Sequence, residues 1–206
     1  MKVLVVMGTR PEVIKLAPVI NALRRRVETV VCTSGQHREM LAQALGFFGI
    51  EPDIGVETMS PGKSLNILSA RLLTELDAVL ERVQPDWVLV QGDTTTAFCA
   101  GLAAFHRGIA VGHVEAGLRT GDLASPFPEE ANRVLLGRIA TRHFAPTESA
   151  ARNLLGEGID AARVVVTGNT VVDAIGMVRD AWQDKPDSLS LPRWDGDEKA
   201  HVLVTC

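Results

Sequence analysis

The chain has 206 residues, 46% of them hydrophobic and 22% charged, which is the composition of an ordinary globular protein with one well-sized core. Its 21 basic and 25 acidic side chains give a net charge of −4, so the charge balance indicates neither a nucleic-acid partner nor an anionic membrane surface. No apolar run reaches the roughly 20 residues of a membrane span, and Met1-Lys2 leads directly into an apolar segment. We therefore expect a cytoplasmic protein without a membrane partner.

The cysteines and histidines do not follow a metal-binding pattern. Cys32, Cys99 and Cys206 are widely spaced, include no Cys-x-x-Cys, and are expected to be reduced and mostly buried. The histidines are scattered, and none lies three or four residues from another ligand on a helix. The sequence therefore predicts no metal centre.

The first part of the chain alternates apolar strands with amphipathic helices. A strand over 2–7 is followed by the turn Gly8-Thr9-Arg10-Pro11-Glu12 and then by apolar residues at helical spacing. A second strand is predicted over 28–33 and a helix begins near Gln36. After an irregular or weakly extended segment over 51–59, a long helix is predicted from Ser64 to Val83, where Pro85 follows.

The same alternation continues to about Trp182. Strands are predicted over 86–91, 109–114, 142–145 and 164–166, each followed by a helix; two glutamates begin the helix near residue 129. The strands lack polar alternation, as expected where both faces of a parallel sheet are covered. The sequence therefore predicts an α/β fold built on a doubly wound parallel sheet.

The end of the chain has a different character. Residues 1–182 are expected to form the domain just described, whereas 183–200 are rich in Asp, Ser, Pro and Gly and are expected to be an interdomain linker. Residues 201–206 are again apolar, and we expect them to begin a truncated second domain. The alternative is an edge strand that docks on the first sheet.

Ionisable residues follow several of the predicted strands. Ligands of an open parallel sheet bind at the carboxyl ends of its strands, so Arg10, Asp93 and Glu115 are expected at one rim, together with the segment Thr167-Gly168-Asn169. The loop after Glu115 must return over that rim, and it brings Glu129 and Arg133 with it. Carboxylates that converge beside cations have pKa values pushed apart, so that acid and base roles can coexist.

Glu115 is the residue with the clearest functional signal. A carboxylate that leaves a buried strand must be paired, protonated or used, and Arg119, four residues on, is a candidate partner. The turn at Gly8-Thr9-Arg10 offers N–H groups and a guanidinium at a helix N-terminus, which suits a phosphate or a second domain. It is neither a dinucleotide fingerprint nor a P-loop, and a simple strand–helix turn is the alternative.

Four of the other residues also have ordinary structural interpretations. Asp93 is placed like a helix cap. Glu129 and Arg133 have the i,i+4 spacing of a local helical ion pair, which contributes a few tenths of a kcal/mol. Lys15, one turn into the first helix, could be a solvated surface lysine.

Taken together, six motifs closely resemble those of the non-hydrolysing bacterial UDP-N-acetylglucosamine 2-epimerases. They occur in family order at Gly8-Thr9-Arg10-Pro11-Glu12 with Lys15, Gln36-His37-Arg38, Gly92-Asp93-Thr94-Thr95-Thr96, Gly112-His113-Val114-Glu115-Ala116-Gly117-Leu118-Arg119-Thr120, Pro128-Glu129-Glu130-Ala131-Asn132-Arg133 and Thr167-Gly168-Asn169-Thr170. The resemblance implies a Rossmann-like domain that is the N-terminal half of a two-domain GT-B arrangement. It also implies a homodimer that needs no nicotinamide or metal cofactor.

The chemistry implied by the resemblance interconverts UDP-N-acetylglucosamine and UDP-N-acetylmannosamine, a reaction tied to cell-envelope polysaccharide biosynthesis. UDP is eliminated to leave 2-acetamidoglucal and is then added back with the C2 proton delivered to the opposite face. The implied catalytic carboxylates are Asp93, Glu115 and Glu129. The implied substrate-binding cations are Arg10, Lys15 and Arg133. Which carboxylate removes the proton is left open, and Gln36 with Arg71 resembles part of a second, allosteric substrate site in some members.

The resemblance is incomplete at the C-terminal end, because the family's His-Arg-Arg-Glu motif and its UDP-binding domain are not in these 206 residues. We therefore expect this chain alone to be inactive. A hydrolysing 2-epimerase, a GT-B glycosyltransferase and a non-enzymatic binding module remain alternatives. A nicotinamide-dependent epimerase of the short-chain dehydrogenase type is excluded, since its catalytic tyrosine has no counterpart in a chain without Tyr.

Overall fold

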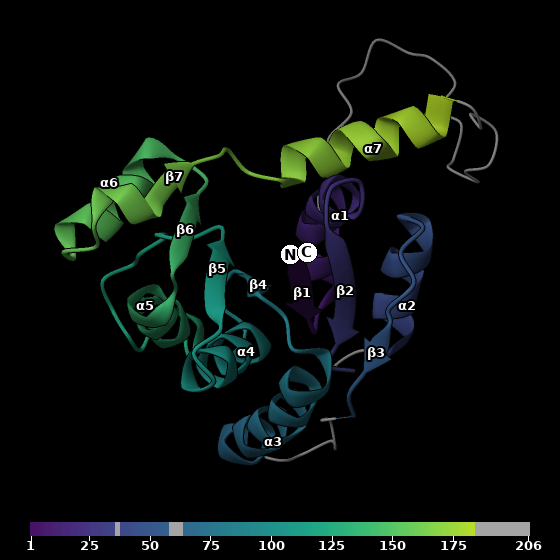
Figure 1. The fold of residues 1–206 in the computed structure, drawn as a ribbon. Coiled ribbons are helices and arrows are strands. Elements are labelled where there is room, and N and C mark those ends of the chain that lie inside the picture. Colours follow the sequence, from purple (N-terminus) through teal and green to yellow (C-terminus); the bar gives the residue numbers. More distant parts are fainter. Residues whose placement is uncertain (36–37, 58–63, 184–206) are drawn as a thin grey trace, which may run out of the picture.

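The computed structural model describes residues 1–35, 38–57 and 64–183. Its strands form one sheet in the order β3-β2-β1-β4-β5-β6-β7, and every neighbouring pair is parallel (Figure 1). The strands are β1 (Lys2–Met7), β2 (Glu28–Thr33), β3 (Ile54–Gly55), β4 (Trp87–Gln91), β5 (Ala110–Val114), β6 (Arg142–Ala145) and β7 (Val164–Val166). The predicted α/β fold with a doubly wound parallel sheet is confirmed.

Helices connect successive strands and cover both faces of the sheet. They are α1 (Arg10–Arg24), α2 (Arg38–Phe47), α3 (Leu65–Val83), α4 (Thr95–His106), α5 (Glu129–Ile139), α6 (Glu148–Gly156) and α7 (Val171–Gln183), with a short 3-10 turn η1 (Ala161–Arg163) before β7. In Figure 1, α1 and α2 lie on one side of the central strands and α3 and α4 on the other.

The two faces of β1 belong to two different cores. Val3, Val5 and Met7 pack with α1 and α2, whereas Leu4 and Val6 pack with α3, α4 and α5. Side chains of a strand point alternately to opposite faces, so a continuous apolar run places apolar groups in both layers. Burial on both sides is why the first strand shows no polar alternation.

The sheet order reverses between β1 and β4. From β1 the chain winds outward through β2 and β3, and then returns to place β4 on the opposite side of β1. The loops that follow β1 and β4 therefore diverge to opposite faces, and ligands of open α/β sheets bind at such a point. These loops carry Thr9 and Asp93.

Hydroxyl side chains begin several helices. Ser64 accepts a hydrogen bond from the Ile67 N–H at 3.4 Å, and Thr94 accepts one from the Ala97 N–H at 3.0 Å. Such caps satisfy N–H groups that have no partner inside the helix. The structural interpretation of Asp93 as the cap of α4 is wrong, because Thr94 occupies that position and leaves the Asp93 carboxylate available.

Several sequence predictions lie outside the described residues. These are Gln36, residues 184–200 of the linker predicted over 183–200, and the segment 201–206. Gln183 is the last residue of α7 rather than the first of the linker. Within residues 1–35, 38–57 and 64–183, no helix is both long enough and apolar enough to cross a membrane.

Candidate active site

Glu115 stands immediately after β5 in an unusual backbone conformation. Its φ is +62°, in the left-handed region that a side chain makes costly. The neighbouring backbone is anchored on both sides, since Val114 accepts from the Gly92 N–H at 3.0 Å and the Ala116 N–H donates to Phe144 at 3.1 Å. The sheet therefore holds the Glu115 side chain, which is 11% exposed, at the rim.

Both oxygens of the Glu115 carboxylate are occupied by donors from three other elements. Lys15 Nζ of α1 lies 2.7 Å from Oε1 and 2.6 Å from Oε2. Asn169 Nδ2, from the loop before α7, donates to Oε1 at 3.0 Å, and Gln91 Nε2 of β4 donates to Oε2. The ion pair and the two amide donors fix the position of this carboxylate. Lys15 therefore contacts Glu115, and the solvated-lysine alternative is wrong; its role in substrate binding stays a prediction.

The predicted partner of Glu115 is wrong. Arg119 turns away and forms a bidentate pair with Glu157, with Nε–Oε1 at 2.6 Å and Nη2–Oε2 at 3.0 Å. The four-residue spacing would favour the pair on a helix, but residues 115–119 form a loop in which that spacing has no such meaning. Arg119 instead ties this loop to the end of α6.

Asp93 lies at the end of β4, next to the Glu115 carboxylate. A Cβ atom added at Gly92 would be 3.8 Å from Glu115 Oε2, so the turn that carries Asp93 passes directly beside that group. Asp93 Oδ2 forms an ion pair with Arg133 of α5, whose Nη2 atom lies 3.3 Å away. Arg133 Nε also lies 3.1 Å from Glu130 Oε2, and it reaches only the backbone oxygen of Glu129, at 3.4 Å. The interpretation of Glu129 and Arg133 as a local ion pair is therefore wrong.

The pKa of Asp93 shows that the charged groups act on one another. Burial raises the pKa of this carboxyl above its usual value, and Arg133 partly offsets the effect. Glu129 and Glu115 raise the pKa further, while Lys15 lowers it. Three carboxylates and two cations thus share one rim, and Asp93 is the member that its surroundings push toward the protonated form.

The sequence reasoning underestimated Glu12. This carboxylate is buried, and its Oε2 accepts from the Gly8 N–H at 2.9 Å and the Thr9 N–H at 2.7 Å. Its Oε1 accepts from the Thr94 hydroxyl at 2.8 Å, which joins the loop after β1 to the loop that carries Asp93. Burial raises the pKa of Glu12 despite these donors. Only the pairing across the switch point reveals this role, because Glu12 alone resembles an ordinary first-turn glutamate.

Of the two amide side chains that contact Glu115, the sequence predicted the position of Asn169 but not the role of Gln91. Asn169 belongs to the segment that the strand-end rule places at the rim, and that prediction is confirmed by its contact with Glu115. Gln91 was treated only as the last residue of an apolar strand. A buried amide at the end of such a strand needs a partner, and this signal could have identified it.

Arg10 stands apart from the carboxylates. Among the described residues it forms no hydrogen bond or ion pair, and its exposed side chain lines an apolar groove of about 330 Å³ between α1, α2 and α7. Ile14, Phe47 and Ile175 are among the other groove residues. Its role as a substrate-binding cation stays a prediction.

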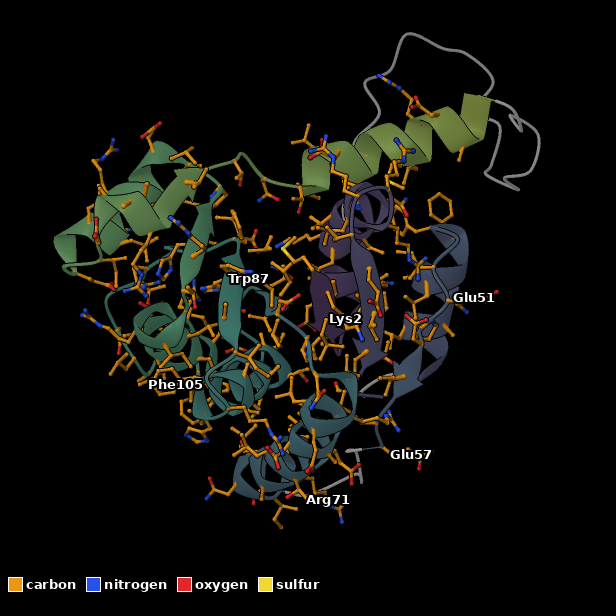
Figure 2. The ribbon with its side chains drawn as sticks, in the orientation of Figure 1. Lys2, Glu51, Glu57, Arg71, Trp87 and Phe105 are labelled. Atoms are coloured by element: carbon orange, nitrogen blue, oxygen red, sulfur yellow. The ribbon has the colours of Figure 1, made fainter. Side chains whose placement is uncertain are left out.

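Arg71 lies on α3, on the far side of the molecule from α7 (Figure 2). Its predicted companion in a second substrate site, Gln36, lies outside the described residues. Among residues 1–35, 38–57 and 64–183, no cluster of three His, Cys, Asp or Glu side chains could hold a metal ion. Cys32 and Cys99 are free and buried, and burial raises the pKa of the Cys32 thiol to about 12.

The chain matches a family model described as UDP-N-acetylglucosamine 2-epimerase over residues 21–206. It is 54% identical over 212 residues to the UDP-N-acetylglucosamine 2-epimerase of Escherichia coli (strain K12). The aligned region covers 100% of this chain and 56% of that relative. It is also 54% identical over 189 residues to the enzyme of that name from Yersinia pestis, and this region covers 91% of this chain and 50% of the relative. The chain thus spans about half the length of the curated relatives it matches.

Solved structures of UDP-GlcNAc 2-epimerases also match this chain over about half of their own length. The structure of UDP-GlcNAc 2-epimerase from Neisseria meningitidis bound to UDP-GlcNAc superposes on this chain with a TM-score of 0.88 at 50% identity. The superposition covers 90% of this chain and 51% of the Neisseria chain. The Methanocaldococcus jannaschii enzyme in complex with UDP-GlcNAc and UDP has a TM-score of 0.84 at 37% identity and covers 90% and 52%. A lipopolysaccharide galactosyltransferase, at 13% identity, a TM-score of 0.54 and coverage of 82% and 46%, shares the fold alone.

The parallel sheet, with carboxylates and cations at its switch point, defines a Rossmann-like chain of the kind that forms one half of a GT-B enzyme. The matches over half of each relative are consistent with this assignment. The chain belongs to the UDP-N-acetylglucosamine 2-epimerase family.

Proposed function

We propose that this chain supplies the catalytic carboxylates of a non-hydrolysing UDP-N-acetylglucosamine 2-epimerase, which interconverts UDP-N-acetylglucosamine and UDP-N-acetylmannosamine. The observation that carries the proposal is the cluster of Asp93, Glu115 and Lys15 at the switch point, in a chain whose relatives have been solved with UDP-GlcNAc bound. A second lobe like that of the relatives would close over this rim and hold most of the UDP.

The proposed reaction eliminates UDP across C1–C2 and adds it back after the C2 proton has changed face. The C2 hydrogen is barely acidic, so the C1–O bond must break early, which leaves positive charge on the sugar and extra negative charge on the diphosphate. Carboxylates near the ring and cations near the phosphate stabilise these charges. Arg10, Lys15 and Arg133 are the proposed substrate-binding cations, with Lys15 and Arg133 placed beside the carboxylates Glu115 and Asp93.

The surroundings of the carboxylates suggest a division of labour. Glu115 is enclosed by donors and is suited to stabilise positive charge as a fixed anion. Asp93, whose pKa burial raises above its usual value, is the carboxyl better suited to take up and release a proton. Glu129 begins α5 beside them and acts on Asp93 through its charge.

Three further features are part of the proposal. The complete protein, meaning this chain joined to a second half like that of its relatives, is a homodimer in the cytoplasm that needs no cofactor. Its product feeds cell-envelope polysaccharide biosynthesis. The isolated 206 residues neither turn over nor bind UDP tightly, so calorimetry of this chain with UDP-GlcNAc should show no submicromolar binding.

The experiment is an incubation of the complete protein with UDP-N-acetylglucosamine in the absence of any acceptor, followed by NMR of the sugars. A mixture of the two UDP-sugar epimers is expected. Free N-acetylmannosamine with UDP would instead identify a hydrolysing enzyme, and unchanged substrate would favour a glycosyltransferase.

A further inference from the structure

We propose that His113 is a positioning residue for Asp93: it donates a hydrogen bond to the Gly92 carbonyl and so fixes the turn that aims the Asp93 carboxyl into the site. The proposal deepens the proposed function and rests on it. His113 lies in β5, is 1% exposed, and has its Nε2 atom 2.7 Å from the Gly92 oxygen. It is buried beneath the site, so it acts through Asp93 rather than on a substrate.

The turn at Gly92 needs external support. Gly92 has φ +69°, and its N–H donates to Val114 at 3.0 Å, while its carbonyl faces the His113 ring. On the other side of the turn, Asn132 Nδ2 of α5 donates to the backbone oxygen of Asp93 at 2.9 Å. Both peptide oxygens around the Asp93 side chain are therefore held by buried side chains from neighbouring elements.

The state of the His113 ring is fixed by this contact. A carbonyl oxygen can only accept, so Nε2 carries the proton and Nδ1 is the bare acceptor. Nδ1 is buried and has no hydrogen-bond partner among the described residues. Burial also lowers the pKa of His113 to about 3, which keeps the ring neutral near neutral pH. A buried acceptor without a partner costs stability, whereas the Nε2–H contact secures the turn.

The neighbouring strand supplies a matched control. His143 of β6 is the register partner of His113 and is equally buried, but neither of its ring nitrogens has a hydrogen-bond partner among the described residues. Replacement of either ring by phenylalanine changes the core in a similar way. Only the change at His113 removes a hydrogen bond to the Asp93 turn.

The test compares His113→Phe, His113→Gln and His143→Phe in the complete protein. We expect His113→Phe to lower kcat by about 10- to 100-fold with KM changed by less than about threefold, because a small misplacement of a reacting group costs this much. Glutamine can place an amide N–H near the position of Nε2, and His113→Gln should recover most of the lost kcat. His143→Phe should keep kcat near that of the parent. Equal losses in the two phenylalanine variants, or no recovery with glutamine, would overturn the proposal.

A second measurement separates this proposal from the proposed function. Carbon NMR of the Asp93 carboxyl in the 206-residue chain needs no turnover. His113→Phe should move the titration of Asp93 toward that of an ordinary aspartate, because a released turn exposes the carboxyl, whereas His143→Phe should leave it unchanged. An unchanged titration in His113→Phe would refute the positioning role, whatever reaction the complete protein catalyses. An inactive parent protein with the expected titration shift would refute only the proposed function.

Discussion

Replacement of Lys15 by methionine should destabilise the chain more than the loss of an ordinary surface lysine would. The substitution keeps most of the aliphatic stem but removes the ammonium group that contacts both oxygens of Glu115 at 2.6 and 2.7 Å. The carboxylate that remains is 11% exposed. Loss of one partner of such a pair leaves a largely buried charge without its counter-ion, and this is the origin of the effect.

The size of the effect follows from the contacts that remain. Breaking a fully buried ion pair costs about 3–5 kcal/mol. Lys15 is 25% exposed, and Gln91 and Asn169 continue to donate to Glu115, so we expect about 2–3 kcal/mol. A domain of this size loses about 2–4 °C in Tm per kcal/mol, which gives a decrease of about 4–12 °C.

The assay is thermal and urea unfolding of the 206-residue chain, with Lys2→Met as the matched control. Lys2 (Figure 2) pairs with Glu28 at 3.1 Å, but the two side chains are 32% and 63% exposed, so its loss should cost less than about 1 kcal/mol. The double variant Lys15→Met/Glu115→Gln should be more stable than Lys15→Met alone, because it no longer buries an unpaired charge. A Lys15→Met variant as stable as Lys2→Met would show that the site ion pair is not formed as described.

Three further predictions concern the site and its support. Burial raises the pKa of Asp93, so the stabilisation linked to its protonated form is present at low pH and lost as the pH rises through the raised pKa. Asp93→Asn should therefore keep or raise Tm near neutral pH. The same variant should lower turnover of the complete protein by about 10²–10⁴-fold. Burial lowers the pKa of His143 from 6.5 to about 4, so between these pH values the unfolded chain binds a proton that the folded chain does not. His143 therefore makes stability fall as the pH drops, by up to about 1.4 kcal/mol per unit. His113, with its pKa lowered to about 3, adds a similar dependence, so in urea titrations across this window His143→Phe should reduce the slope rather than abolish it. At Gly117 (φ +91°) an added Cβ would lie 2.2 Å from the Ala150 backbone oxygen, so Gly117→Ala should lower the free energy of unfolding in urea by more than about 3 kcal/mol. Gly156→Ala is the control and should not destabilise the chain, because an added Cβ there has nothing within 4 Å. Equal stability of the two variants would contradict the packing of this loop on α6.

The sequence predicted the fold because its signals are local. Apolar runs without polar alternation and helical spacing after each of them together predict a doubly wound parallel sheet. The short strand β3 was predicted only as an irregular or weakly extended segment, because its two residues carry almost no periodicity and depend on pairing with β2. Its position is fixed by the sheet rather than by its own side chains.

The site was predicted less completely, because its partners come from distant parts of the chain. The strand-end rule placed Asp93 and Glu115 at one rim, and the structure bears this out. The partner of Glu115 was misassigned to Arg119, since sequence spacing cannot show that Lys15, 100 residues away, faces the carboxylate. The bridging role of Glu12 was invisible for the same reason, because it depends on how two loops meet at the switch point.

The central claim is that the carboxylates at this rim remove and return the C2 proton of a UDP-sugar. The most direct measurement is to let the complete protein act on UDP-N-acetylglucosamine in D2O and to follow C2 by NMR, with Asp93→Asn as the control. The account predicts that deuterium enters C2 of both epimers and that the control incorporates it far more slowly. Epimers that form with hydrogen retained at C2, or equal incorporation by the Asp93→Asn variant, would contradict it.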